Sequence, residues 1–120
     1  MTVDLLAMAE YFPPGKYDNL GTMEFAFITT RLKSLRKKSG VLSPDIPHFR
    51  ERCKERRITE EEAIELRMSG EVTTLEINLD PWETGIRERY ILRKRSKDRT
   101  IDGVFEVRGD ALIGITAYVP

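Results

Sequence analysis

A histidine and two arginines recur at four-residue spacing near the middle of the 120-residue chain: His48, Arg52 and Arg56. In a helix this spacing places the three side chains in one row on one face. An imidazole with an ordinary pKa of about 6.5 exchanges a proton near neutral pH, and guanidiniums bind phosphate through paired hydrogen bonds. The row therefore predicts a phosphate site with a titratable group. A structural role is the alternative, in which His48 caps a helix after Pro47 and the arginines pair with nearby glutamates.

The charge of the chain is arranged in blocks. Its 20 Lys and Arg residues balance 20 Asp and Glu residues to a net charge of zero. Residues 31–57 nevertheless carry an excess of seven positive charges, residues 58–86 an excess of seven negative charges, and residues 87–99 an excess of five positive charges. Two basic segments brought together by folding would attract a polyanion. Mutual neutralisation of the blocks as surface ion pairs is the alternative.

Composition limits the class of protein. With 40% hydrophobic and 33% charged residues, residues 1–120 are expected to form a single globular domain. No run of about 18 apolar residues and no signal-peptide pattern occurs, so we expect a cytoplasmic protein rather than a membrane-spanning one. Cys53 is the only cysteine and His48 the only histidine, which excludes an intrachain disulfide and a Cys/His zinc cluster. No metal or cofactor is expected.

Helical periodicity predicts four helices before residue 70, over residues 3–12, 22–38, 47–56 and 59–68. Thr59 with Glu62 three residues later is typical of a capping box at the start of the last one. A polar loop is expected at 13–21 and an extended connector at 41–47. The apolar stripes expected to face the core comprise Phe25, Ile28, Leu32 and Leu35 in the second helix and Phe49 and Cys53 in the third.

From residue 73 the apolar period changes to two, which is typical of strands. Strands are expected at 73–79, 88–92, 101–107 and 111–119, the last two joined by the tight turn Arg108-Gly109-Asp110. In the last strand the expected core face comprises Ala111, Ile113, Ile115, Ala117 and Val119, and the opposite face Leu112, Gly114, Thr116 and Tyr118. Helices followed by four antiparallel strands predict an α+β fold with the helices on one face of the sheet.

The segment from His48 to Thr59 resembles the first helix of a small domain-of-unknown-function family grouped with RelE-like and BrnT-like toxins. That family has His, Arg and Arg at four-residue spacing, usually Gly, then Ile and Ser or Thr, and a short acidic helix that ends in Gly. The positions that match are His48, Arg52, Arg56, Ile58, Thr59, Gly70 and the last-strand segment Ile115-Thr116-Ala117-Tyr118. Arg57 departs from the pattern, because it stands where the family usually has Gly, the residue that favours a left-handed cap.

The resemblance covers about residues 48–118. It implies that residues 47–120 form a RelE-like toxin-type core and that residues 1–46 are an N-terminal helical extension of the same domain. The implied fold is shared by barnase-like, EndoU, colicin-type and RelE-like ribonucleases, in which RNA lies across a four-stranded antiparallel sheet. Such enzymes cleave RNA without a metal: a base takes the 2′-hydroxyl proton, the oxygen attacks phosphorus, and an acid protonates the leaving 5′-oxygen.

The resemblance and the residue types together give a set of candidate site residues. The expected catalytic residues are His48, Arg52, Arg56, Thr116 and Tyr118. The residues expected to bind RNA are Arg89, Arg93, Arg95 and Trp82, the last by stacking on a base.

The leading hypothesis is a metal-independent ribonuclease toxin, a hydrolase held silent by an antitoxin or immunity protein. RNA is the expected partner, with tRNA and ribosome-bound mRNA as its candidate forms. The alternative is a non-catalytic nucleic-acid- or protein-binding module of a phage or mobile element. A third hypothesis, the immunity partner itself, is disfavoured by the basic clusters.

Overall fold

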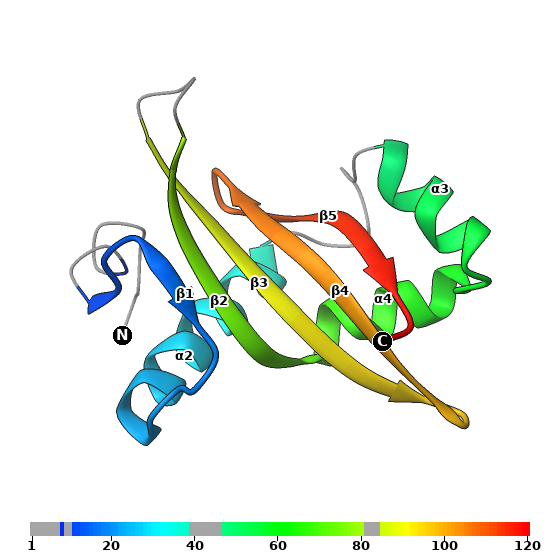
Figure 1. Ribbon diagram of the computed structural model, residues 1–120, viewed down its shortest axis with the longest axis horizontal. Coiled ribbons are helices and arrows are strands. Elements are labelled where there is room, and N and C mark those ends of the chain that lie inside the picture. Colours follow the sequence, from blue (N-terminus) through cyan, green and yellow to red (C-terminus); the bar gives the residue numbers. More distant parts are fainter. Residues whose placement is uncertain (1–7, 9–10, 39–46, 81–84) are drawn as a thin grey trace.

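The computed structural model describes residues 8, 11–38, 47–80 and 85–120. Three helices and one five-stranded sheet make up an α+β fold (Figure 1). The helices are α2 (Thr22–Lys38), α3 (Pro47–Glu55) and α4 (Glu60–Ser69). The strands are β1 (Gly15–Tyr17), β2 (Glu71–Asp80), β3 (Gly85–Ser96), β4 (Arg99–Arg108) and β5 (Ala111–Tyr118).

The strands lie in the order β1-β2-β3-β4-β5, and each pair of neighbours is antiparallel. The last four strands are the four expected from the sequence. The fifth, β1, lies in the range expected to be a loop and pairs with β2 through Gly15 opposite Ile77 and Tyr17 opposite Leu75. A strand of three residues is too short to show an apolar alternation, so its pairing partner, rather than its own sequence, defines it.

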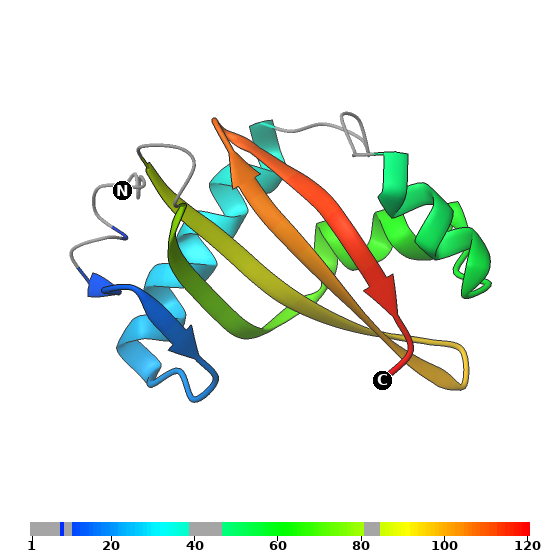
Figure 2. The same ribbon diagram turned by 45° about the horizontal axis from the view of Figure 1, so that its top comes forward.

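The helices cover one face of the sheet. α2 and α4 lie on the same side of the strands, and α3 lies beside β5 (Figures 1 and 2). The buried side chains of Tyr90, Leu92 and Phe105 belong to the hydrophobic core between the sheet and these helices. Because side chains alternate along a strand, the residues between them point to the opposite face of the sheet. None of the described helices is both long and apolar enough to span a membrane.

The expected helices agree closely with the structure. α2 has the expected range, and α3 and α4 differ from theirs by about one residue. Thr59 and Glu62 form the complete capping box, with each side chain accepting from the backbone N–H of the other. Of the helix expected at 3–12, Met8 and Tyr11 are helical, and the remainder lies largely outside the described residues, as does most of the connector expected at 41–47.

The core stripe of α2 is shorter than the sequence indicates. Ile28, Leu32 and Leu35 are buried, but Phe25 is 48% exposed. Phe25 lies in the first turn of α2 and lines a surface hollow with Leu20, so the prediction that it faces the core was wrong.

The turn between α3 and α4 is a Schellman motif with an arginine at its left-handed position. The Ile58 N–H donates to the Cys53 carbonyl over 2.8 Å, and the Arg57 N–H donates to the Lys54 carbonyl over 3.2 Å. Arg57 has a φ of 56°. A glycine would adopt this conformation without the steric cost that a Cβ brings.

β5 contains a bulge that changes which side chains face the core. Phe105 lies opposite Gly114 and Val104 lies opposite Thr116, so Ile115 is the additional residue. The face assignment expected for β5 was therefore wrong in part before the bulge, although Ile113 is buried as expected. Leu112 lies in the core instead of on the outer face, whereas Ala117, after the bulge, is in the core as expected. Val119 lies beyond the strand and is 45% exposed.

Gly114 marks the place where α3 approaches the sheet. A Cβ at this position would lie 2.8 Å from ring atoms of Phe49, closer than carbon atoms can approach. The Phe49 ring in turn packs on Phe105, with ring centroids 5.8 Å apart. The absence of a side chain at Gly114 thus allows α3 to pack against β5.

Candidate nucleic-acid interface

A row of arginines follows the outer face of the central strand. Arg87, Arg89, Arg93 and Arg95 alternate with the inward residues of β3, and the pairing of β3 with β4 is regular from Arg89 to Ser96. Successive members two residues apart are separated by about 6.6–6.8 Å along the strand. Arg108 of β4 points to the same side, two residues beyond Glu106, which lies opposite Arg89. We call the outer surface formed by Arg87, Arg89, Arg93, Arg95 and Arg108 the arginine face.

Glu106 holds three of these arginines together. Its Oε1 lies 2.8 Å from Arg89 Nε and 3.2 Å from Arg87 Nε, and its Oε2 lies 2.6 Å from Arg108 Nε. Burial alone would raise the pKa of Glu106, but the hydrogen bonds from Arg108 and Arg89 outweigh it and lower the pKa. The carboxylate is therefore ionised at neutral pH and orients three guanidiniums while neutralising one of them.

Further along β3, one guanidinium and one carboxylate form an ion pair in which the two charges cancel. Arg93 makes a two-pronged contact with Asp102, Nε to Oδ1 at 2.7 Å and Nη2 to Oδ2 at 2.9 Å. Tyr118 lies opposite Asp102 in the β4–β5 pairing, so it joins the same outer surface. Arg95 makes no ion pair with any residue that the structure describes. Against the five guanidiniums of the arginine face, the carboxylates of Asp102 and Glu106, together with those of Glu71 and Glu76 opposite Arg93 and Arg89, leave an excess of one positive charge among these nine groups.

Two arginines of the first basic segment are used inside the fold. Arg31 is buried in an ion pair with Glu88. Arg36 donates to the carbonyl oxygens of Arg67 over 2.7 Å and Gly70 over 2.6 Å, where α4 ends. Burial, reinforced by the charge of Arg67, lowers the pKa of Arg36. The positive charge of these two residues therefore serves the packing of α2 rather than an outer surface.

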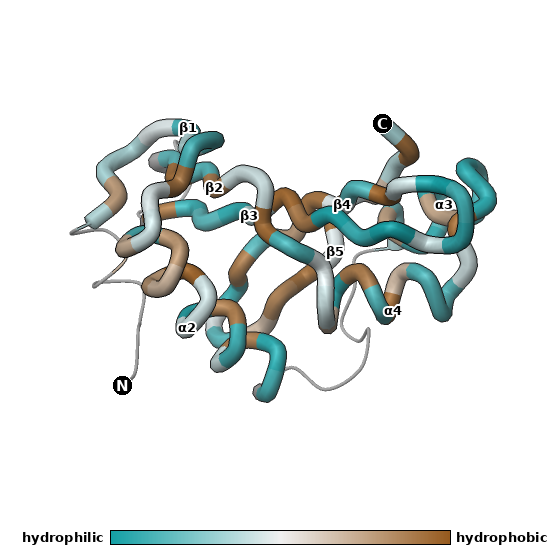
Figure 3. The backbone as a smooth tube through the Cα atoms, turned by 90° about the horizontal axis from the view of Figure 1, so that it is seen from below, coloured by the Kyte–Doolittle hydropathy of each residue, from teal (hydrophilic) through white to brown (hydrophobic). Residues whose placement is uncertain are grey.

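The row His48, Arg52 and Arg56 lies on the solvent side of α3. The His48 side chain is 76% exposed, and its Nδ1 lies 3.6 Å from the Glu51 carboxylate. Arg52 Nη1 lies 3.2 Å from Glu55 Oε2. Ion pairs between residues three apart on an exposed helix contribute little to stability. Figure 3 shows α3 as a largely hydrophilic segment.

Arg56 and Thr116 are brought together. Arg56 lies just past the end of α3, and its Nη1 donates to Thr116 Oγ1 over 2.9 Å and to the Ala117 carbonyl over 2.6 Å. The structure therefore connects the α3 row to β5, and through β5 to Tyr118. It shows no contact of His48 with Thr116 or Tyr118 among the described residues, and Trp82 lies outside them.

Two parts of the arginine face were not identified from the sequence. Arg87 shares the alternation of Arg89, Arg93 and Arg95, so the period of two could have identified it. Glu106 and Arg108 could not be found in that way, because their role depends on the register between β3 and β4. Within the described parts of the chain, no cluster of three or more His, Cys, Asp and Glu residues could hold a metal ion.

Comparison of the chain with models of protein families, with curated proteins and with solved structures finds no match. The chemistry of the arginine face and of the α3 row therefore carries the functional interpretation.

Proposed function

We propose that the protein binds RNA through the arginine face. The observation that carries the proposal is the arrangement of Arg87, Arg89 and Arg108 around the single buried carboxylate of Glu106. A carboxylate whose only role was to balance surface charge would need a single basic partner. Here one carboxylate orients three guanidiniums on a face to which no described helix packs.

The arginine face has the features of a site for a flexible polyanion. Guanidiniums recognise phosphate oxygens through paired hydrogen bonds, and their positions along β3 follow an extended path. Tyr118 at the edge of this surface offers a ring on which an unpaired base can stack. A single strand of RNA supplies both the phosphates and the exposed bases.

A second candidate function is cleavage of the bound RNA, as in a metal-independent ribonuclease toxin. The contact of Arg56 with Thr116 favours it, because this contact joins the α3 row to the strand that carries Tyr118. In this mechanism His48 exchanges the proton and Arg52 and Arg56 hold the phosphate, as in the toxin family that residues 48–118 resemble. An acidic antitoxin or immunity protein would then cover the basic surface.

RNA binding is tested by fluorescence anisotropy with a labelled single-stranded RNA at several salt concentrations. The variant Arg87→Gln/Arg89→Gln/Arg108→Gln should bind more weakly, and the slope of log K against log salt should become shallower by about two to three. The control Lys33→Gln/Lys37→Gln removes two exposed positive charges from α2 and should bind like the wild type. Equal affinity and slope in the wild type and the triple variant would disprove binding through this face.

Cleavage is tested separately by incubating total RNA and tRNA with the protein in EDTA. Products with 2′,3′-cyclic phosphate ends from the wild type, and none from His48→Ala, would establish the ribonuclease mechanism. If the protein binds RNA and the RNA remains uncleaved, the protein is a non-catalytic RNA-binding module. Cleavage by His48→Ala at the wild-type rate would remove His48 from the mechanism.

A further inference from the structure

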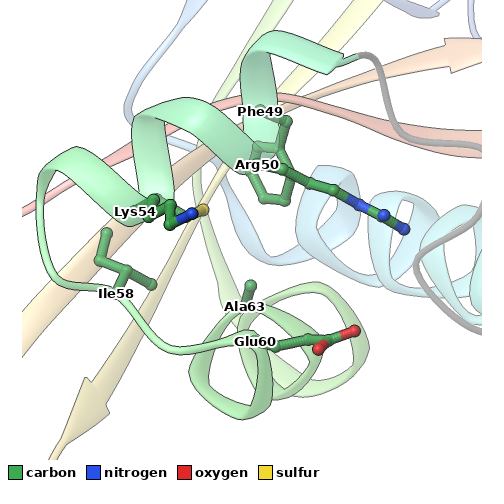
Figure 4. Close-up of a pocket in the computed structure, with 7 residues that line it drawn as sticks. Phe49, Arg50, Lys54, Ile58, Glu60 and Ala63 are labelled. Carbon is green, nitrogen blue, oxygen red and sulfur yellow. The ribbon is translucent and has the colours of Figure 1, made fainter.

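A pocket of 320 Å³ opens between α3 and α4 (Figure 4). Its floor is apolar and consists of Phe49, Cys53, Ile58 and Ala63, each at most 6% exposed. The Schellman turn holds Ile58 in this floor, and the small side chain of Ala63 leaves the space open.

The rim of the pocket carries two positive charges that have no partner among the described residues. Arg50 and Lys54 are exposed, one turn apart on α3, and neither side chain makes a hydrogen bond or ion pair with any residue that the structure describes. Among the described residues that line the pocket, Glu60 of α4 is the only acidic one. Arg52, on the same helix, is paired with Glu55, so the rim differs from the rest of α3 in having unused positive charge.

We propose that this pocket docks an acidic peptide segment of a protein partner. The segment inserts one large apolar side chain onto the floor and places carboxylates against Arg50 and Lys54. The volume is at the small end of ligand pockets, which suits a single anchoring side chain. An apolar anchor surrounded by charge-complementary contacts is a common design of peptide recognition, in which the anchor supplies affinity and the charges supply specificity.

This site is separate from the arginine face. The pocket lies between two helices, whereas the arginine face is on the side of the sheet to which no described helix packs. The acidic segment and RNA can therefore bind at the same time, and peptide docking does not depend on RNA binding.

The test is selection from a displayed library of random peptides of about twelve residues. Selection uses the wild-type protein, and the variant Arg50→Glu/Lys54→Glu serves for counter-selection. The enriched peptides should combine a Leu, Phe or Trp with at least two acidic residues. The charge-reversal variant should bind them about tenfold or more weakly, whereas Lys33→Glu/Lys37→Glu, with the same change of net charge on α2, should bind within about twofold of the wild type.

Cys53 provides a second measurement, because it is the only cysteine of the chain and lies in the floor. A bound peptide should slow the labelling of its thiol, and the labelled RNA should not. If Arg50→Glu/Lys54→Glu fails to fold, Arg50→Gln/Lys54→Gln replaces it, and this variant should bind the peptides about threefold or more weakly than the wild type.

Three outcomes would overturn the proposal. The first is enrichment of peptides that lack the apolar and acidic combination, and the second is equally tight binding of the enriched peptides to the rim variants and the wild type. Loss of RNA affinity without loss of peptide affinity in the rim variants would assign Arg50 and Lys54 to nucleic acid instead.

Discussion

Arg31 on α2 and Glu88 on β3 form an ion pair within the core, 57 residues apart in sequence. Arg31 Nη2 lies 2.9 Å from Glu88 Oε1 and Arg31 Nε lies 3.3 Å from Oε2. Glu88 is 1% exposed, and the Tyr90 hydroxyl donates to its Oε2. Burial raises the pKa of Tyr90 well above 10, so the hydroxyl remains a donor. This cluster connects α2 to the centre of the sheet.

Removing Glu88 should be strongly destabilising. Glu88→Ala takes this carboxylate from the buried Arg31, and we expect the free energy of unfolding to fall by about 3–5 kcal/mol. The double variant Arg31→Met/Glu88→Leu removes both charges and should lose much less, or nothing. Urea denaturation of the two variants and the wild type measures the difference. A loss below about 1 kcal/mol in Glu88→Ala would contradict the importance of the pair.

Arg57→Gly should stabilise the protein. Arg57 occupies the left-handed position of the Schellman motif with a φ of 56°, and glycine adopts this conformation without a steric cost. We expect a gain of about 1 kcal/mol. Arg57→Ala retains a Cβ, so it serves as the control and should give no gain. The contact of Arg99 with the Arg57 carbonyl involves the backbone and is retained in both variants. A gain in Arg57→Ala equal to that in Arg57→Gly would disprove the conformational explanation.

Glu62 should make stability depend on pH in the acid range. The Thr59 backbone N–H, followed by Ser96 and then Arg99, holds the pKa of Glu62 at about 2 instead of 4.5. A lowered pKa contributes stability above the ordinary value, and this contribution is lost as the pH falls from about 5 towards 2. In Glu62→Gln the free energy of unfolding should fall by less than in the wild type over this range. The difference between the two proteins should be on the order of 1–2 kcal/mol.

The exposed neighbour Glu61 provides the control for this pH dependence. Glu61→Gln removes a carboxylate from the same helical turn and should keep the wild-type pH profile. Urea midpoints measured between pH 6 and 2.5 compare the three proteins. Identical profiles for Glu62→Gln and the wild type would rule out the contribution of Glu62.

Glu106→Gln should move stability and RNA affinity in opposite directions. Without its charge, Arg87, Arg89 and Arg108 repel one another, and we expect a loss of about 1–3 kcal/mol of stability. The same change adds one positive charge to the arginine face, so RNA should bind more tightly at low salt. Glu76→Gln, which removes a carboxylate without an ion pair within the described residues, should change stability little. Weaker RNA binding by a folded Glu106→Gln protein would argue that Glu106 itself contacts the ligand.

The features that the sequence predicted correctly are local ones. The capping box of Thr59 and Glu62 spans three residues, and the stripe of Ile28, Leu32 and Leu35 follows from one helix period. The bulge at Ile115 and the pairing of β1 depend on contacts with other strands, so no local pattern encodes them. For the site, the alternation in β3 places Arg89, Arg93 and Arg95 on one face. The convergence of Arg87 and Arg108 on Glu106 requires the register of two strands.

The contact between Arg56 and the Ala117 carbonyl also bears on how the chain avoids self-association. β5 is an edge strand, and edge strands present unpaired backbone groups to which another strand can add. The guanidinium of Arg56 donates a hydrogen bond to the Ala117 carbonyl of this strand, and α3 packs beside the same strand. A second copy would have to displace a charged side chain and a helix before it could extend the sheet there. The residue that the sequence suggests for phosphate binding thus also protects the sheet edge against aggregation.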